Sequence, residues 1–269
     1  MKTPCFDTVI LSDLHLGSEV SRANAALRTL KAMSFRRLIL LGDIFCDLNF
    51  RRLKKEHWQF LGYIRKLSNP KRNTDVVWVE GNHDQGLSDV MSHLVGVEVF
   101  HEYVWDFCGR RHLAIHGHQF DRFVINNLPL SNLFMAFYLQ IQKLDFGKKR
   151  FARFLERLDT AWLRLSSKVA SGALAHAEAK GAQRVFCGHT HEAMYTAVNG
   201  IEYFNSGSWT QAAATYVTVD EEGVQIHEYD ERADDRDPGE ERGETAPALA
   251  ELAGPAGLCP DVEYEGVSG

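Results

Sequence analysis

Five short apolar runs of this chain each end in side chains that can bind metal ions, and this repeat constrains the fold more than any other feature. Each run has the length and the β-branched content of a buried strand. Buried parallel strands bring the loops at their carboxyl ends together at one edge of a sheet. The runs and the groups that follow them are residues 9–11 with Asp13 and His15, 38–41 with Asp43, 76–79 with Asn82, 113–115 with His116, and 185–187 with His189 and His191. The sequence therefore predicts that these side chains converge at one rim of a sheet core.

The composition is that of a globular protein with one substantial core, since 45% of the 269 residues are hydrophobic and 25% are charged. A secretory signal is not expected, because Lys2 is followed by Thr3, Pro4 and Cys5 rather than by a continuous apolar segment. No stretch reaches the about 18 to 20 apolar residues that span a bilayer. The five cysteines are scattered without a C-x-x-C pair, which favours a reduced, cytoplasmic protein.

The acidic residues are concentrated at the end of the chain. Residues 231–269 carry eleven acidic side chains against Arg232, Arg236 and Arg242, and they are rich in Pro, Gly and Ala without any periodicity. This composition predicts a disordered acidic tail that follows one folded domain over residues 1–230. The tail carries a net charge of −8 and the whole chain one of −6, so the rest of the chain carries +2. The folded domain is then close to neutral or slightly basic, which suits an anionic substrate.

Strand-like and helix-like segments alternate through the first half, as expected for an α/β layered domain. Residues 22–33 and 57–67 have helical patterns between the strand-like runs. The second half instead has short alternating runs at 194–198, 201–204, 216–219 and 224–229, separated by Asn199-Gly200 and Glu222-Gly223. These are hairpin signals, and they predict an antiparallel meander that closes the domain.

Residues 122–180 form a different segment, inserted between His116 and His189. Two amphipathic helical patterns, interrupted at Gly147, carry an apolar stripe and a face rich in Lys and Arg. One interpretation is a helical hairpin that packs its stripe onto the core and leaves its cations in solvent. The other is a helical cap that holds acyl chains or lies on an anionic membrane face. The second interpretation would place the protein at the inner face of the cytoplasmic membrane.

The converging side chains suit a pair of divalent metal ions. Two such ions about 3.5–4 Å apart clamp the attacking and leaving oxygens of a displacement at phosphorus. Asp43, on a tight turn after a buried strand, is the expected bridge between the ions. Asp13 and His15 can bind one ion, His116 the other, and Asn82 supplies a neutral oxygen. His189 and His191 alternate along the chain, so that each can serve one ion.

The ligand types favour particular metals, because imidazole-rich shells with carboxylates fit Mn, Fe or Zn better than Mg or Ca. We expect two Mn²⁺ ions, with Fe and Zn as alternatives. His83 follows the expected ligand Asn82 and need not be a ligand itself. It can stabilise charge on the phosphate or protonate the leaving oxygen, with Asp84 orienting its ring. His118 lies in the same loop as His116, but the chemistry requires no role for it.

The ordered motifs D-x-H, GD, GNHD, H-G and G-H-x-H resemble those of the calcineurin-like metallophosphoesterase superfamily, over residues 7–229. The resemblance implies a four-layer α/β/β/α sandwich with a dinuclear site. Residues 12–17, 116–121 and 207–209 and the helical insertion further resemble the UDP-2,3-diacylglucosamine diphosphatase family, in the paralogue type that carries GNHD. This resemblance implies that the substrate lies between the metal site and the insertion, where Asp121 and Lys168 would face it.

Four positions depart from the family patterns. Cys46 stands where the superfamily has the last carboxylate of GD-x-x-D, and His118 where the diphosphatase family usually has Asp. His83 stands where the best-studied branch has Arg, and Ser208 where the paralogue branch tends to have Asp. None of the four is an expected metal ligand, so the departures concern the substrate.

The leading hypothesis is hydrolysis of the pyrophosphate bond in a UDP-linked glycolipid such as UDP-2,3-diacylglucosamine. The alternatives are a broader phosphodiesterase or phosphatase acting on nucleotides or phosphoproteins, and a scaffold that kept the fold and lost the chemistry. Nucleic acid is not an expected partner, because the folded domain lacks the positive charge that backbone binding requires. The sequence leaves the oligomeric state open.

Overall fold

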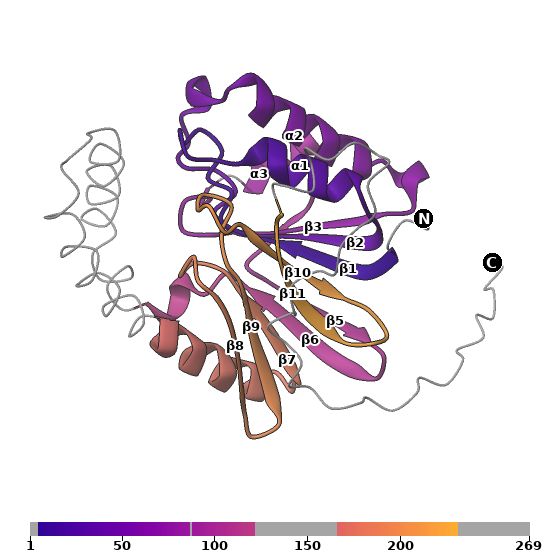
Figure 1. Ribbon diagram of the computed structural model, residues 1–269, viewed down its shortest axis with the longest axis vertical. Helices are drawn as coiled ribbons and strands as arrows, with labels where there is room; N and C mark the ends of the chain where they lie inside the picture. Colours follow the sequence, from indigo (N-terminus) through magenta and orange to yellow (C-terminus); the bar gives the residue numbers. More distant parts are fainter. Residues whose placement is uncertain (1–4, 87, 122–165, 231–269) are drawn as a thin grey trace, which may run out of the picture.

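The structure, a computed structural model, describes residues 5–86, 88–121 and 166–230. The predicted tail and most of the predicted insertion, residues 122–165, lie outside this range. The described chain forms two β-sheets that pack face to face, with helices on both outer surfaces (Figure 1). In the part that is described, no helix combines the length and the apolar character needed to cross a bilayer.

The first sheet has six strands in the order β11-β10-β1-β2-β3-β4. They are β1 (Cys5–Leu11), β2 (Ser34–Leu41), β3 (Asp75–Val79), β4 (Val99–Phe100), β10 (Thr215–Val219) and β11 (Val224–Glu228). Strands β1 to β4 run parallel, as strands joined by helical crossovers do. The crossover helices α1 (Ala23–Lys31), α2 (Lys55–Leu67) and α3 (Ser88–Val95) cover one face of this sheet (Figure 1).

The second sheet has five strands in the order β5-β6-β7-β9-β8. They are β5 (Glu102–Phe107), β6 (Arg110–Ile115), β7 (Arg184–Cys187), β8 (Ala193–Val198) and β9 (Ile201–Ser206). Strand β7 pairs in parallel with both β6 and β9. The carboxyl ends of β6 and β7 therefore meet at the same edge, and the loops after them are neighbours.

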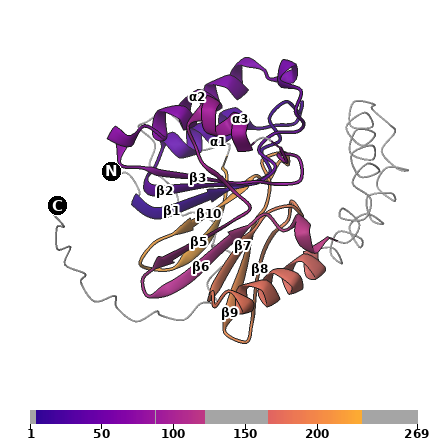
Figure 2. The same ribbon diagram turned by 180° about the vertical axis from the view of Figure 1, so that it is seen from behind.

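Alternation along the strands divides the core into three layers of apolar contact. Val9 and Leu11 of β1 pack against the helices of the first sheet, whereas Ile10 points to the second sheet. On the far side, a helix over residues 166–179 packs Ala173 and Ala177 against the second sheet (Figure 2). The small alanine side chains let this helix lie close to the sheet. These layers confirm the predicted α/β/β/α sandwich.

The two predicted hairpins are present, but the predicted single meander is wrong. Strands β8 and β9 turn at Asn199-Gly200 and belong to the second sheet, whereas β10 and β11 turn at 220–223 and belong to the first. The chain crosses from one sheet to the other over residues 207–214. The reason is non-local pairing, because β9 joins β7 in parallel and β10 joins the far edge of β1.

The end of the predicted helical insertion also differs from a cap. Residues 166–179 form the outer helix that packs on the second sheet, so this part of residues 122–180 is a layer of the core. Three 3-10 turns complete the described elements: η1 (Phe50–Arg52), η2 (Pro70–Arg72) and η3 (His118–Phe120).

Candidate metal centre

The loops after five strands bring most of the predicted ligands together at one end of the sandwich. Three sets of ligand atoms each lie within 4.8 Å of one another. The sets are Asp13, His15 and His191; His15, Asp43 and His83; and Asp43, His116 and His189. His15 belongs to the first two sets and Asp43 to the last two, so the sets form one continuous row of donors. A row of this kind can hold two neighbouring cations.

The backbone at these positions is unusual. Five of the predicted ligands have a left-handed backbone, with φ between 47° and 68°: Asp13, His15, Asp43, His189 and His191. Residues other than glycine adopt this conformation rarely and at an energetic cost. The loops hold one another in this state, since the N–H of Asp13 donates to the carbonyl of Gly42 at 3.0 Å. Sequence reasoning did not anticipate this strain.

Two glycines that precede expected ligands allow the loops to approach so closely. A Cβ on Gly81 would lie 2.2 Å from Oδ1 of Asp43, and a Cβ on Gly188 would lie 2.4 Å from Oδ2 of Asp13. Both distances are far below any van der Waals contact, so that a side chain at either position would displace a carboxylate of the neighbouring loop.

Several polar atoms of the site are buried without a hydrogen bond. Among the described residues these include Asp13 Oδ1, Asn82 Oδ1 and His116 Nε2. Buried polar atoms normally find partners, and groups that do not point to a missing ion or water. The unpaired Asn82 oxygen fits the role of a neutral metal ligand that the sequence predicted. Together with the imidazole and carboxylate groups around it, the donor set suits Mn, Fe or Zn.

The spacing of two rings also fits a cation. The Nε2 atoms of His15 and His191 face each other at 3.1 Å. Two nitrogen ligands at about 2.1 Å from one ion, on adjacent coordination positions, are about 3.0 Å apart. His191 Nε2 also lies 3.1 Å from Asp13 Oδ1, within the same set.

Partners outside the row fix how the imidazole rings point. His116 Nδ1 donates to the Leu41 carbonyl at 3.0 Å, which leaves Nε2 toward the site. His189 Nε2 lies 3.2 Å from Oδ2 of Asp121, which leaves Nδ1 free to bind an ion. Such outer hydrogen bonds select the tautomer and the orientation of metal-binding histidines.

The surroundings of Asp43 and His15 lower the pKa of both groups, so the carboxylate is ionised and the imidazole is neutral. Burial alone would raise the pKa of Asp43, but the His116 and His83 rings outweigh it and hold that pKa well below its usual value. Burial and the adjacent His191 and His83 rings lower the pKa of His15 to about 3. An ionised carboxylate beside a neutral imidazole is the state in which both can bind a cation.

His116 behaves differently from His15. Burial disfavours its charge, but Asp43 and then Asp13 outweigh this and raise the pKa of His116 to about 9. Its Nε2 lies 3.4 Å from Oδ2 of Asp43. A proton at this nitrogen compensates the carboxylate charge, and a metal ion would take its place.

Asp84 does not have the predicted role. Its two oxygens accept the backbone N–H groups of Ile44 at 3.1 Å and Phe45 at 3.0 Å, so it anchors the loop that carries Asp43. The His83 ring instead donates from Nδ1 to the Cys46 carbonyl at 2.8 Å. The prediction that Asp84 orients His83 is therefore wrong, because two backbone donors on the Asp43 loop occupy its carboxylate.

Asp121 and Lys168, expected to face a substrate, lie in different surroundings. Asp121 is buried, with its carboxylate against His189. Lys168 is exposed on the first turn of the helix over 166–179. That turn lies at the same end of the sandwich, since Ser166 Oγ donates to the Glu192 carboxylate at 2.8 Å, next to His191.

Two supporting residues were not identified from the sequence. The Asn205 amide donates to the Gly188 carbonyl at 2.7 Å and to Thr190 Oγ1 at 3.1 Å, and so holds the loop of His189. The backbone N–H of Trp209 donates to the Asp13 carbonyl at 3.1 Å. Both follow the apolar run at 201–204, so the strand-end pattern that revealed the ligands could have indicated them. His118 is also buried here, with its Nε2 3.3 Å from the Gln85 amide.

Similarity to known proteins extends over most of the chain. The sequence profile described as "Calcineurin-like phosphoesterase superfamily domain" matches residues 6–224. A curated relative, UDP-2,3-diacylglucosamine hydrolase of Neisseria meningitidis serogroup B, is 25% identical over 230 residues, covering 80% of this chain and 94% of the relative.

Solved structures with a similar fold include a novel archaeal phosphodiesterase and Vps29 of Chaetomium thermophilum. The archaeal protein is 13% identical with a TM-score of 0.45, and the match covers 82% of this chain and 98% of that one. Vps29 is 12% identical with a TM-score of 0.46, over 84% of this chain and 91% of that one.

Proposed function

Because this chain belongs to the calcineurin-like phosphoesterase superfamily, we propose that it is a metal-dependent hydrolase of the pyrophosphate bond in a UDP-linked glycolipid such as UDP-2,3-diacylglucosamine. The observation that carries the hydrolase activity is the row of donors shared through His15 and Asp43. The substrate is proposed from the named activity of the Neisseria relative, which matches this chain over most of its length.

The proposed site holds two divalent ions, with Mn²⁺ as the first choice and Fe or Zn as alternatives. Bound there, the ions would supply Lewis-acid stabilisation of phosphoryl charge and a water of lowered pKa. Asp43 would be shared between them. The remaining proposed ligands are Asp13, His15 and His191 on one side, and Asn82, His116 and His189 on the other.

His83 is the proposed proton donor. Because its Nδ1–H donates to the Cys46 carbonyl, Nε2 is the ring atom directed at the site, 3.9 Å from Oδ2 of Asp43. In the doubly protonated ring, Nε2–H can hydrogen-bond a phosphoryl oxygen from this position and pass its proton to the leaving oxygen, which leaves a neutral ring that keeps Nδ1–H. The ring is mostly buried, so the carbonyl partner keeps it in one orientation.

Asp84 acts on the reaction only through the loop that carries Asp43. Burial, with the charge of Asp43, raises the pKa of Asp84 to about 6, and the N–H groups of Phe45 and Ile44 oppose this rise. Its carboxylate therefore positions the proposed bridging ligand. Lys168 is the proposed contact for a substrate phosphate, since it is exposed on the helical turn whose Ser166 hydroxyl contacts Glu192, next to His191.

The lipid part of the proposed substrate implies an apolar partner outside the metal centre. The amphipathic, cationic pattern of residues 122–165 supports binding to acyl chains or to an anionic membrane face. Co-sedimentation with anionic vesicles, but not with zwitterionic ones, is the expected result. Equal binding to both would contradict recognition of the anionic charge, and binding to neither would contradict membrane association.

Turnover of the proposed substrate is the direct test. Purified protein with Mn²⁺ and UDP-2,3-diacylglucosamine is expected to release UMP, and His116→Ala serves as the inactive control. No release above the control ends the proposal for this substrate. If bis-p-nitrophenyl phosphate is then cleaved equally well with and without detergent micelles, the broader phosphodiesterase hypothesis is favoured instead.

A further inference from the structure

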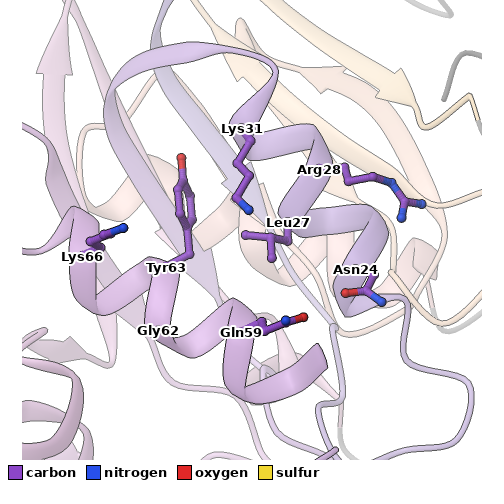
Figure 3. A pocket seen from close by; sticks show the side chains of 8 residues that line it. All are labelled: Asn24, Leu27, Arg28, Lys31, Gln59, Gly62, Tyr63 and Lys66. Atoms are coloured by element: carbon purple, nitrogen blue, oxygen red, sulfur yellow. The ribbon is translucent and has the colours of Figure 1, made fainter. Parts of the chain in front are cut away.

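Helices α1 and α2 form an open groove on the outer surface of the first sheet's helical layer, with a volume of about 470 Å³ (Figure 3). The residues that line it are Asn24, Leu27, Arg28, Lys31, Gln59, Gly62, Tyr63 and Lys66. Three of them are cationic and none is acidic. Over the full length of both helices, Glu56 is the one acidic residue against five Lys and Arg side chains. The groove therefore combines positive charge with uncharged polar and apolar side chains.

Gly62 leaves part of this groove open. It lies in the interior of α2, where glycine lowers helix stability relative to alanine. A Cβ at this position would meet nothing within 4 Å, so packing among the described residues does not require glycine here. The same residue in Figure 3 lies on the floor between Tyr63 and Gln59. The space above α2 is thus available to another segment.

The chain leaves the described domain beside this groove. Tyr229, just after β11, accepts a hydrogen bond at its hydroxyl from Arg28 Nη2 at 2.8 Å, and Arg28 lines the groove. The Arg22 guanidinium lies 5.3 Å from the centre of the same ring. Tyr229 also donates its N–H to the Ala214 carbonyl at 2.8 Å. The point from which residue 231 departs is therefore fixed against α1.

We propose that residues 231–244 dock in the groove between α1 and α2 of the same molecule. This segment has seven acidic side chains against three arginines, and it begins next to Arg28. An extended chain spans about 3.3–3.6 Å per residue. The first seven residues of the segment therefore suffice to pass along α1, whose nine residues rise about 13 Å.

Charge and tethering together favour this occupant over a free anion. Single exposed ion pairs are weak. Several pairs made by one tethered segment act together, because a short linker gives an effective concentration of millimolar order. Lys31 belongs to α1 and Lys66 to α2, so a segment that lies between the two helices passes both lysines. Tyr63 and Leu27 also line the groove and add apolar surface to it.

Zero-length carbodiimide cross-linking of the full chain tests the proposal, because it joins a lysine amine to a carboxylate only at contact distance. We expect cross-links from Lys31 and Lys66 to acidic residues of 231–244. Lys55 and Lys71 are exposed lysines of the same helical layer outside the groove, and they serve as internal controls. The cross-links are expected at about 0.01 M ionic strength and lost at about 1 M, where the Debye length falls from about 30 Å to about 3 Å.

Equal yields at the groove lysines and at the control lysines would overturn the proposal, as would yields that do not change with salt. Mixing isotope-labelled and unlabelled protein separates docking within one molecule from docking on a second copy. Cross-links found only between differently labelled chains would also overturn it.

A charge-reversal pair gives a second measurement that does not depend on lysine chemistry. In Lys31→Glu/Lys66→Glu, trypsin is expected to cleave after Arg232, Arg236 and Arg242 about fivefold faster than in the parent chain. Lys55→Glu/Lys71→Glu changes the net charge equally and is expected to leave the cleavage rate unchanged. Equal acceleration in both variants would mean that net charge alone matters and would contradict docking. Neither readout depends on catalysis, so failure of the proposed function does not affect the test.

Discussion

His15 and His191 face each other across the two sheets of the sandwich, with their Nε2 atoms 3.1 Å apart. His15 follows β1 in the first sheet, and His191 follows β7 in the second. Two ring nitrogens at this distance repel unless a proton or a cation lies between their lone pairs. A proton or a cation between these two rings would therefore also favour the contact between the two sheets.

Loss of either ring is expected to release metal. In His15→Ala and in His191→Ala, affinity for divalent ions should fall at least about 100-fold, because each ring supplies a ligand atom rather than an outer contact. Metal content measured by mass spectrometry, together with thermal unfolding, checks this. His101→Ala, at a ring that is 87% exposed, is the control and should keep its metal. Full metal content in both site variants would refute the ligand assignment.

Two roles are possible for Asp121, namely positioning of the His189 ring and contact with the substrate, and they predict changes in different constants. If its carboxylate holds the His189 ring, Asp121→Asn lowers metal affinity about 10- to 100-fold, and this is the expected outcome. If it contacts the substrate instead, KM rises while metal affinity stays unchanged. Metal titration beside steady-state kinetics distinguishes the two. Asp106→Asn, at an exposed carboxylate paired with Arg111, is the matched control.

His83→Gln is expected to lower kcat by about 10²- to 10⁴-fold while the metal content is retained. The backbone N–H of His83, which donates to Asp43 Oδ1 at 2.8 Å, is unaffected by this substitution. The measurement is kcat with saturating metal, accompanied by metal analysis. If metal is lost as well, His83 is a ligand in the set it forms with His15 and Asp43, and the proton-donor role is refuted.

Gly81→Ala is expected to abolish activity, because its Cβ would lie 2.2 Å from the Asp43 carboxylate and 2.3 Å from the Asp43 backbone nitrogen and would displace both. The same substitution at Gly62 adds a Cβ that meets nothing within 4 Å. Gly62→Ala should therefore keep full activity and stabilise α2 by about 1 kcal/mol. Denaturant unfolding and turnover of both variants provide the comparison. Unchanged activity in Gly81→Ala would show that the loops are less tightly packed than described.

Acid sensitivity should depend on His112, which lies far from the metal centre. Burial, reinforced by Arg184, lowers the pKa of His112 from 6.5 to about 4, and the ring stacks on Trp105 with centroids 4.9 Å apart. Between these pH values the unfolded state binds more protons than the folded state. The free energy of unfolding therefore falls as the pH falls from 6.5 to 4, by up to about 3 kcal/mol from this group.

The variant His112→Gln removes this titration. Its unfolding free energy should fall less steeply over the same pH range, even if its stability at pH 7 is lower. Urea unfolding at several pH values measures both slopes. Parallel slopes in the variant and the parent would contradict the assignment.

The convergence of the side chains that follow the strands could be predicted from the sequence, because apolar runs and the groups after them are local features. Six of the seven predicted ligands lie in the donor sets, and the unpaired oxygen of Asn82 is buried beside them. That these residues bind metal stays a prediction. The left-handed backbone of Asp13 and Asp43 could not be anticipated, since it results from contacts between loops that are distant in sequence.

The errors share one cause, which is that partners far along the chain decide the outcome. The turn at Asn199-Gly200 predicts a hairpin, but nothing local indicates which sheet the hairpin joins. The acidic side chain of Asp84 stands next to His83, yet two amides from residues 44 and 45 take its oxygens. The helix over 166–179 has an alanine-rich face whose pattern alone does not separate a core layer from a cap.

The loops of Asp13 and Asp43 belong to one half of the sandwich, and those of His116 and His191 to the other. A cation bound by ligands from both sheets would join the two halves at the candidate metal centre. Removal of the metal by a chelator would then abolish activity and also shorten the lifetime of the folded state at elevated temperature. The resistance of such a protein to unfolding would depend on the available metal as well as on its amino-acid sequence.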